Sequence, residues 1–158
     1  MIYPIPDQIG EATDESTEHH VVNALRALGH NVSVLGVGES VGAFVNALLE
    51  RKPEMIFNLT EEFRGNRLMD RNIVAVLEMA GIPFTGSGPT GLMLCRRKGL
   101  CKQLLSLHRI RVPSFLVFPP RRPIRVPCRL SYPMVIKPAY GDGSDGISNA
   151  SLVRDESA

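Results

Sequence analysis

Hydrophobic and polar residues follow helical and strand periods in turn along the first half of the chain. From Thr17 to Leu28, apolar residues recur at the spacing of one helix face, and Ser16 or Thr17 can cap the amino end. The run from Asn31 to Leu35 alternates polar and apolar side chains, as a half-buried strand does. These two patterns recur up to residue 85, and they predict helices over 39–50 and 73–79 and strands over 55–57 and 82–85.

This alternation predicts the fold class of the first half. Strands joined to helices by connections of a few residues are typical of a parallel sheet covered by helices. Only residues 1–3 can form a strand ahead of the first helix, so we expect the amino end to lack residues. The first half is therefore expected to be an α/β domain.

The second half is richer in proline, arginine and glycine. One helix is predicted over 91–107, with Gly99 in its middle. A proline- and arginine-rich connector over 113–127 holds one strand candidate, 114–118. Two further strands, over 132–138 and 147–153, are expected to form a hairpin around a glycine loop.

The composition shift near residues 86–110 sets the expected domain organisation. We expect an α/β domain over 1–88, a connecting helix over 89–110, and the start of a second, incomplete domain over 111–158.

Composition and charge narrow the class of protein. Of the 158 residues, 44% are hydrophobic and 22% are charged, which is typical of a soluble globular protein. The net charge is +2, and the densest basic cluster lies among prolines, which indicates a solvated loop and no nucleic-acid partner: Arg121, Arg122, Arg125 and Arg129. The sequence has no apolar run near 18 residues, no signal peptide and only three cysteines without metal spacing, so we expect a cytoplasmic protein without a membrane partner.

Lys137 and the loop behind it carry the main chemical signal. The apolar residues Val135 and Ile136 predict that the stem of Lys137 is partly buried, where an ammonium group is costly without an anion. The loop 141–146 adds three glycines, and the Ser144 hydroxyl adds a donor. One fixed cation beside free backbone N–H groups suits a polyphosphate. A solvent-facing lysine and a flexible hairpin turn would explain the two features separately.

Other polar residues carry weaker signals. Lys98 lies in a charged stretch of the predicted helix 91–107, which would ordinarily be a solvated face. His19 and His20 are adjacent, so their side chains point apart on a helix, and no third metal ligand is spaced to join them. The cysteines are interpreted as packing residues. The residues therefore predict no metal site.

Taken together, the segments resemble the ATP-grasp superfamily, and specifically the D-alanine–D-alanine ligase-like carboxylate–amine ligases. The matching segments occur in the family's order and cover most of residues 20–154: 57–59, 76–87, 98–102, 111–115, 132–138 and 143–147. The resemblance implies a pre-ATP-grasp (Rossmann-like) domain with a parallel sheet, followed by the first part of an ATP-grasp α+β nucleotide-binding lobe.

The resemblance also implies a reaction and a set of site residues. In such ligases ATP phosphorylates a carboxylate to an acyl phosphate, and an amine then displaces the phosphate. Lys98 and Lys137 match the two family lysines that contact ATP phosphates. The glycine-rich loop that closes over the phosphates is matched by Gly143, Ser144, Asp145 and Gly146. Two cations and backbone donors suit phosphoryl transfer, which depends on positioning and charge neutralisation.

The sequence departs from the family in the substrate region. Residues 60–65 stand where the dipeptide ligases usually carry a His-Gly element, which puts D-alanine in doubt, although Glu61 or Glu62 can still meet a substrate amine. The family's amino-terminal substrate glutamate has two candidates, Glu18 and Glu15.

The expected function is the amino-terminal part of an ATP-dependent, ADP-forming carboxylate–amine ligase. The chain ends before the family's adenine-binding segment and its Mg²⁺ ligands, so we expect it to be inactive by itself. The expected partners are ATP, Mg²⁺ and an amino-acid or peptide substrate, and a homodimer is the assembly that the resemblance suggests. The alternatives are a ligase for a different amino acid or peptide and a non-catalytic α/β module that binds a nucleotide or a partner.

Overall fold

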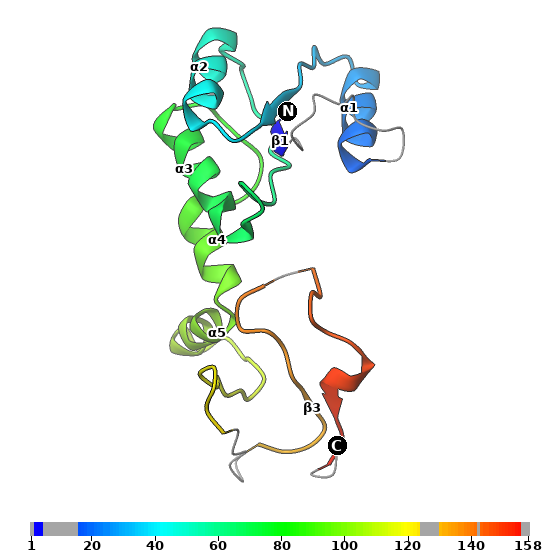
Figure 1. The fold of residues 1–158 in the computed structure, drawn as a ribbon, viewed down its shortest axis with the longest axis vertical. Coiled ribbons are helices and arrows are strands. Elements are labelled where there is room, and N and C mark those ends of the chain that lie inside the picture. Colours follow the sequence, from blue (N-terminus) through cyan, green and yellow to red (C-terminus); the bar gives the residue numbers. More distant parts are fainter. Residues whose placement is uncertain (1, 5–15, 124–129, 142, 156–158) are drawn as a thin grey trace. The chain divides into compact units, whose positions relative to one another are not determined.

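A computed structural model of the chain describes residues 2–4, 16–123, 130–141 and 143–155. The chain forms two compact units, Met1–Leu92 and Met93–Ala158. Both helices and short strands occur, so the protein is of the α/β type, as expected (Figure 1). None of the helices in the described ranges has the length and apolar content needed to cross a lipid bilayer.

The first unit contains a parallel strand pair and the longer helices. Its elements are β1 (Ile2–Pro4), α1 (Thr17–Ala27), β2 (Leu35–Val37), α2 (Val41–Arg51), the short 3₁₀ helix η1 (Arg67–Met69), α3 (Asp70–Met79) and the first half of α4 (Pro89–Arg96). Strands β1 and β2 pair in parallel, with Ile2 opposite Leu35 and Pro4 opposite Val37 (Figure 1). The strand expected ahead of the first helix is therefore present.

The three predicted helices of the first unit are present, and serine side chains cap the amino ends of α1 and α2. The Ser16 hydroxyl accepts a hydrogen bond from the His19 N–H at 3.2 Å, and Ser40 caps α2 in the same way. Helix α2 ends at Lys52, which adopts a left-handed conformation with φ 43° directly before Pro53. Helix α3 is followed by Gly81 with φ +67°, so the predicted end of this helix is confirmed.

The second predicted strand is displaced along the sequence. The prediction placed it over 31–35, whereas β2 spans Leu35–Val37. Side chains of the flanking helices occupy the carbonyls upstream of β2: Arg26 Nη2 donates to Val32 at 3.5 Å, and Arg51 Nη1 donates to Val34 at 2.8 Å. Arginine side chains therefore satisfy these two carbonyls where the predicted strand would have required strand partners.

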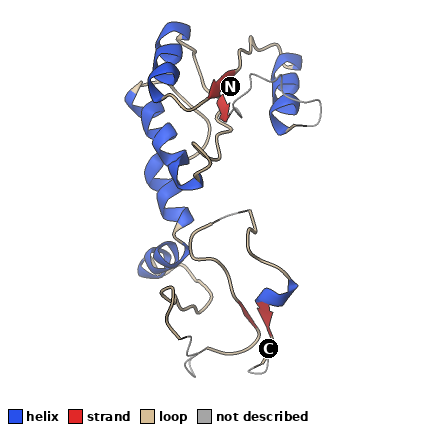
Figure 2. Ribbon diagram, in the orientation of Figure 1, coloured by secondary structure: helices blue, strands red, loops and turns tan. Residues whose placement is uncertain are grey.

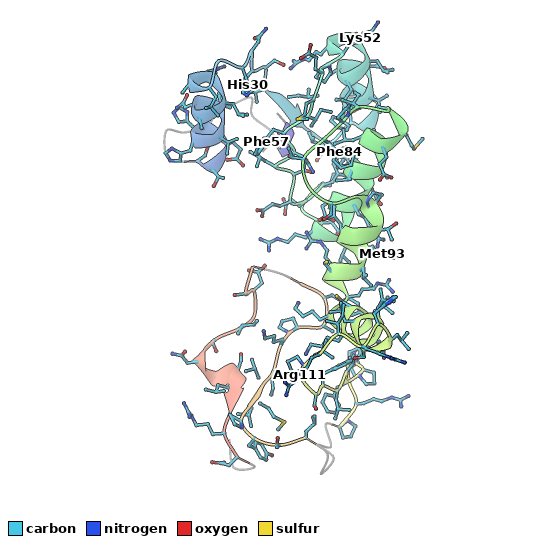
Figure 3. The ribbon with its side chains drawn as sticks, turned by 180° about the vertical axis from the view of Figure 1, so that it is seen from behind. His30, Lys52, Phe57, Phe84, Met93 and Arg111 are labelled. Carbon is cyan, nitrogen blue, oxygen red and sulfur yellow. The ribbon has the colours of Figure 1, made fainter. Side chains whose placement is uncertain are left out.

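The segments predicted as strands over 55–57 and 82–85 meet in a parallel bridge between Ile56 and Phe84. The Ile56 N–H donates to the carbonyl of Pro83 at 2.8 Å, and the Thr85 N–H donates to the carbonyl of Ile56 at 2.9 Å. Phe84 and Phe57, the residue after Ile56, are both labelled in Figure 3. The parallel direction is as expected. The described residues show these short parallel pairings and no continuous multi-stranded sheet.

The core of the first unit lies between β2, α2, the 55–57 segment and α3. On both helices the two side chains that join the buried cluster are four residues apart, which places them on one face. The buried cluster consists of Val37, Phe44, Leu48, Ile56, Ile73 and Leu77. Ile82 and Phe84 are partly buried and pack against it. The hydrophobic pattern therefore predicts the faces that build this core.

The single helix predicted over 91–107 is wrong, because the structure has two helices. Helix α4 ends at Arg96, α5 spans Lys98–Leu107, and Arg97 leaves the helical region with φ −99° and ψ 76°. Arg97 instead pairs with Tyr140 in an isolated antiparallel bridge. A contact with a residue far along the chain therefore breaks the helix, and Gly99 lies inside α5.

Gly99 marks a close approach between α5 and the 115–117 segment. A Cβ atom on Gly99 would lie 2.6 Å from Cγ2 of Val117 and 4.0 Å from Cε2 of Phe115. The Lys102 ammonium lies 5.1 Å from the centre of the Phe115 ring, on the next turn of the helix. The strand predicted over 114–118 does not form, because this segment packs against α5 through side chains.

The hairpin predicted at the end of the chain is confirmed but is shorter than expected. β3 (Met134–Val135) and β4 (Leu152–Val153) pair in an antiparallel manner, with Met134 opposite Val153. The remainder of the predicted second strand forms the 3₁₀ helix η2 (Asn149–Ser151), capped by the Ser148 hydroxyl. Apart from α5, η2 and these two strands, most of the second unit is loop (Figure 2). Residues 124–129, with Arg125, Cys128 and Arg129, lie outside the described residues.

We predict that Leu77→Ala lowers the free energy of unfolding by about 2–5 kcal/mol, because it leaves a cavity in the core. Leu77 is 0% exposed, whereas Met79 on the same helix is 87% exposed. Met79→Ala is therefore the matched control and should change the free energy by less than about 0.5 kcal/mol. Urea unfolding followed by circular dichroism measures both values. Equal effects of the two substitutions would contradict the assigned core.

We predict that Gly99→Ala destabilises the protein by about 1–3 kcal/mol, because the new methyl group collides with Val117. In a Val117→Ala background the collision is absent, so the same substitution should stabilise α5 by about 0.5–1 kcal/mol through helix propensity. Thermal unfolding of the wild type, the two single variants and the double variant measures the effect of Gly99→Ala on stability in each background. Destabilisation of equal size in the two backgrounds would disprove the close approach.

Candidate functional site

The start of α5 is joined to the segment that follows β3. The Lys98 N–H donates to the carbonyl of Ala139 at 3.4 Å, and Arg97 pairs with Tyr140 in the antiparallel bridge. The Lys98 ammonium, Nζ, donates to the carbonyl of Gly141. Lys98 is half-buried in this position. The structure thus places Lys98 against the base of the glycine loop and not on a solvated helix face.

Lys137 lies on the same segment, four residues before Gly141. Its side chain is exposed, and the preceding Val135 and Ile136 are 52% and 59% exposed, so the predicted burial of the lysine stem is wrong. Among the described residues β3 pairs with β4 alone, and this two-stranded ladder leaves the lysine uncovered. Four residues of backbone limit the Cα–Cα distance between Lys137 and Gly141 to roughly 14 Å. Lys98 and Lys137 therefore belong to one local region.

The glycine loop folds back over Pro138. A Cβ atom on Gly146, which has φ +68°, would lie 3.0 Å from Cγ of Pro138. Ser144 adopts φ 65°, and its carbonyl accepts a hydrogen bond from the Ile147 N–H at 3.0 Å. All four residues of the turn that the resemblance assigns to phosphate binding are exposed: Gly143, Ser144, Asp145 and Gly146. Asp142 lies outside the described residues.

This arrangement has the chemistry of a polyphosphate site. Lys98 supplies positive charge at the loop base, Lys137 supplies a second cation four residues earlier in the chain, and an exposed turn supplies backbone N–H groups and one hydroxyl. Phosphate oxygens accept hydrogen bonds from both kinds of donor, and the charged donors bind them more strongly. The residues present therefore fit the phosphates of a nucleotide.

A second polar cluster lies in the first unit, where the paired segments around Ile56 and Phe84 end. The Asn58 N–H donates to Oγ1 of Thr85 at 3.0 Å. Oδ1 of Asn58 accepts from the Thr60 N–H at 3.1 Å and from the Thr60 hydroxyl at 2.7 Å. Ligands of open α/β sheets bind beyond the carboxyl ends of parallel strands, which is the position of this cluster. The structure therefore joins two sequence motifs that are 27 residues apart.

Arg64 holds the loop that follows Asn58, and sequence reasoning does not identify it. Its Nε and Nη2 atoms donate to the carbonyl of Glu39 at 3.0 and 2.6 Å. Its guanidinium carbon lies 5.4 Å from the centre of the Phe63 ring. Arg64 and Gly65 both have positive φ, in a turn closed by the antiparallel bridge between Phe63 and Asn66. Arg64 thus connects two loops that follow neighbouring segments of the α/β unit, and the only sequence signal for this turn is Gly65.

The candidate residues divide between the two units. Lys98, Lys137 and the loop turn lie in the second unit, whereas Glu18 and Glu61 lie in the first. Glu18 is half-buried in the first turn of α1, and Glu61 is exposed in the loop after Asn58. Glu62 is half-buried in the same loop, and Glu15 lies outside the described residues. The structure therefore groups the phosphate candidates together and leaves the substrate candidates in the other unit.

The histidines and cysteines show no site of their own in the described ranges. His20 is exposed, and Nε2 of His19 lies 2.7 Å from Nδ2 of Asn23. Cys101 is half-buried. Cys95 is exposed, so the interpretation of Cys95 as a packing residue is wrong. No group of three or more His, Cys, Asp or Glu side chains in the described residues is arranged to hold a metal ion.

Comparison with known proteins gives several similar sequences. No protein-family model matches the chain. A D-alanine–D-alanine ligase of Nitratidesulfovibrio vulgaris strain DP4 is 32% identical over 124 residues, which are 78% of this chain and 39% of the relative. A D-alanine–D-alanine ligase of Rhodospirillum rubrum is 29% identical over 125 residues, 79% of this chain and 40% of the relative. The uncharacterised protein y4sG of Sinorhizobium fredii is 36% identical over 99 residues, 63% of this chain and 29% of the relative.

These matches confirm the resemblance that the sequence motifs indicate. Most of the chain is similar to part of several D-alanine–D-alanine ligases, at about 30% identity. The chain spans about two fifths of the length of these ligases, 39% of the first and 40% of the second.

We predict that Arg64→Ala speeds hydrogen exchange of the Phe63 and Asn66 amides about fivefold, because it removes both donors to the Glu39 carbonyl. Arg64→Lys keeps the charge but not the paired donors, so it should give an intermediate rate. Exchange monitored by NMR measures all three proteins. An unchanged rate in Arg64→Ala would show that the loop is held by other contacts.

Proposed function

We propose that this chain is the amino-terminal part of an ATP-dependent carboxylate–amine ligase that resembles D-alanine–D-alanine ligases and forms ADP. The observation that carries the proposal is the contact of the Lys98 ammonium with Gly141, at the base of the loop that follows Lys137. This contact joins Lys98 to the segment that carries the other two elements that the resemblance relates to ATP phosphates, Lys137 and the glycine loop. The similarity to named ligases supports the reaction class.

In this proposal the residues of the second unit bind and orient the ATP phosphates. Lys98 and Lys137 neutralise the negative charge of the phosphates, and the Gly143–Gly146 turn donates hydrogen bonds from its backbone and from Ser144. Phosphoryl transfer depends mainly on such positioning and charge stabilisation. The substrate carboxylate takes the terminal phosphoryl group of ATP to give an acyl phosphate and ADP. An amine then attacks the acyl carbon and displaces phosphate.

The first unit, in the same proposal, supplies substrate recognition. Its polar cluster at Asn58, Thr60 and Thr85 lies at the ends of parallel segments, and Glu18 or Glu61 is the candidate for the substrate amine. We propose an amino acid or a peptide as the substrate class. D-alanine itself is not assigned, because the loop that carries Arg64 stands in place of the His-Gly element of the dipeptide ligases.

The proposal includes the wider organisation expected from the resemblance. Residues 1–88 would be a pre-ATP-grasp domain with a Rossmann-like sheet, 89–110 the connection, and 111–158 the start of the ATP-grasp lobe. Mg²⁺ would accompany ATP, held by residues outside this sequence, and the 158 residues alone would not turn over ATP. The full protein would act in the cytoplasm, as a homodimer if it follows the ligases.

We predict that Lys137→Ala in the full-length protein lowers ATP-dependent phosphate release at least about hundredfold, because a charge that stabilises the transferring phosphoryl group is lost. Lys102→Ala is the matched control: this lysine also belongs to the second unit, but its ammonium faces the Phe115 ring. The assay measures phosphate release with Mg²⁺, ATP and a panel of amino acids and dipeptides.

The same assay separates the alternatives. Full activity of Lys137→Ala would refute the role of this lysine, and ATP turnover by the 158-residue chain would refute its inactivity. Nucleotide binding by the full-length protein without phosphate release on any substrate would support a non-catalytic binding module.

A further inference from the structure

We propose that the Lys98 ammonium changes partner during nucleotide binding. In the nucleotide-free protein it binds the Gly141 carbonyl, and with nucleotide present it binds a phosphate oxygen and releases the base of the glycine loop. This inference rests on the proposed function, because it requires Lys98 to be a phosphate ligand. It adds a coupling between phosphate binding and the loop that covers the phosphates.

The structure provides a lysine that can move without its helix. The Lys98 N–H is bonded to Ala139 at 3.4 Å, and the Arg97–Tyr140 bridge lies next to it. Both contacts are between backbones, so they hold the start of α5 against the 139–141 segment whatever the side chain does. The contact with Gly141 is made by the flexible end of the side chain. Only this third contact has to break for the ammonium to change partner.

The exchange favours phosphate on chemical grounds. An ammonium group has three N–H donors and no preferred plane, so it accepts a new partner by rotation about its stem. The Gly141 carbonyl is a neutral acceptor, whereas a phosphate oxygen is anionic, so the ammonium gains a charge–charge attraction when phosphate replaces the carbonyl. The carbonyl therefore holds the lysine only until a polyphosphate arrives.

Release of Gly141 acts on the loop because this residue is where the loop begins. The far end is held by the packing of Gly146 on Pro138 and by the Ser144–Ile147 turn. Loss of the lysine contact frees the near end while the far end stays anchored. A ligand shifts such an equilibrium only if it binds the two states differently, and in this proposal phosphate does so because the ammonium turns toward the phosphate and away from Gly141 to bind it.

A single carbonyl resonance can test this exchange. Within these 158 residues the dipeptide Gly-Asp occurs once, at Gly141 and the residue after it. Labelling glycine with ¹³C at the carbonyl and aspartate with ¹⁵N therefore gives one HNCO signal from this segment. The probe is the Mg²⁺ complex of AMP-PNP, added to the chain and, with segmental labelling, to the full-length protein. A carbonyl carbon moves upfield when it loses a hydrogen bond.

The expected result is an upfield shift of the Gly141 carbonyl when AMP-PNP is added to the wild-type protein. Lys98→Met should show the shifted position without nucleotide, and nucleotide should move it no further. Lys98→Arg retains a cationic donor and should keep the unshifted position. Lys102→Met, one helical turn away, should behave as wild type and controls for general effects on α5.

Calorimetric binding of AMP-PNP distinguishes the possible failures. If nucleotide binds and the carbonyl signal is the same in wild type and in Lys98→Met, the exchange of partners is overturned and the proposed function stands. If the full-length wild-type protein binds no nucleotide, the proposed function fails and the exchange fails with it. If Lys102→Met shifts the signal as Lys98→Met does, the shift reports a disturbed helix and the assignment to Lys98 is overturned.

Discussion

The second unit depends on one backbone contact, the pairing of Arg97 with Tyr140. Arg97 cannot keep helical dihedral angles and pair with an extended segment at the same time, so the helix stops and starts again one residue later. Successive residues of a helix are about 100° apart around its axis, so an uninterrupted helix would direct Lys98 elsewhere. The break turns Lys98 into the first residue of α5 and sets it beside the segment that carries Lys137. The arrangement of the phosphate candidates is a consequence of this pairing and of the adjacent hydrogen bond from the Lys98 N–H to the carbonyl of Ala139.

In the first unit, apolar packing determines the position of the polar residues at the ends of the paired segments. Ile56 is buried in the core, and the parallel bridge to Phe84 brings the two chain segments into register. Their next polar residues, Asn58 and Thr85, must then lie side by side, because both segments run in the same direction. Arg64 extends this edge by connecting its loop to the carbonyl of Glu39. Hydrophobic burial thus determines where hydrogen-bonding groups collect.

Sequence patterns predict the features of this structure that depend on interactions between residues close together in the chain. The helices α1, α2 and α3 have clear apolar faces, and Ser16 and Ser40 cap the first two, so their positions follow from local rules. The break at Arg97 has no such signal: neither glycine nor proline stands there, and the cause is Tyr140, over forty residues away. The burial of Lys137 fails as a prediction because it assumes neighbouring strands that the described residues do not form. The resemblance identifies Lys98 as a candidate. The role of Arg64 depends on its left-handed backbone conformation, which the sequence does not predict for an arginine.

The contact between Gly99 and Val117 has a consequence for how this protein can change over evolutionary time. The space at the two positions is shared, since a Cβ atom on the first would lie 2.6 Å from a methyl group of the second. A residue larger than glycine at position 99 fits only after Val117 has been replaced by a smaller residue. The order of the two substitutions therefore matters. Related sequences should therefore vary at these positions in a correlated way, and a lineage that has lost the valine gains a freedom on α5 that this chain lacks.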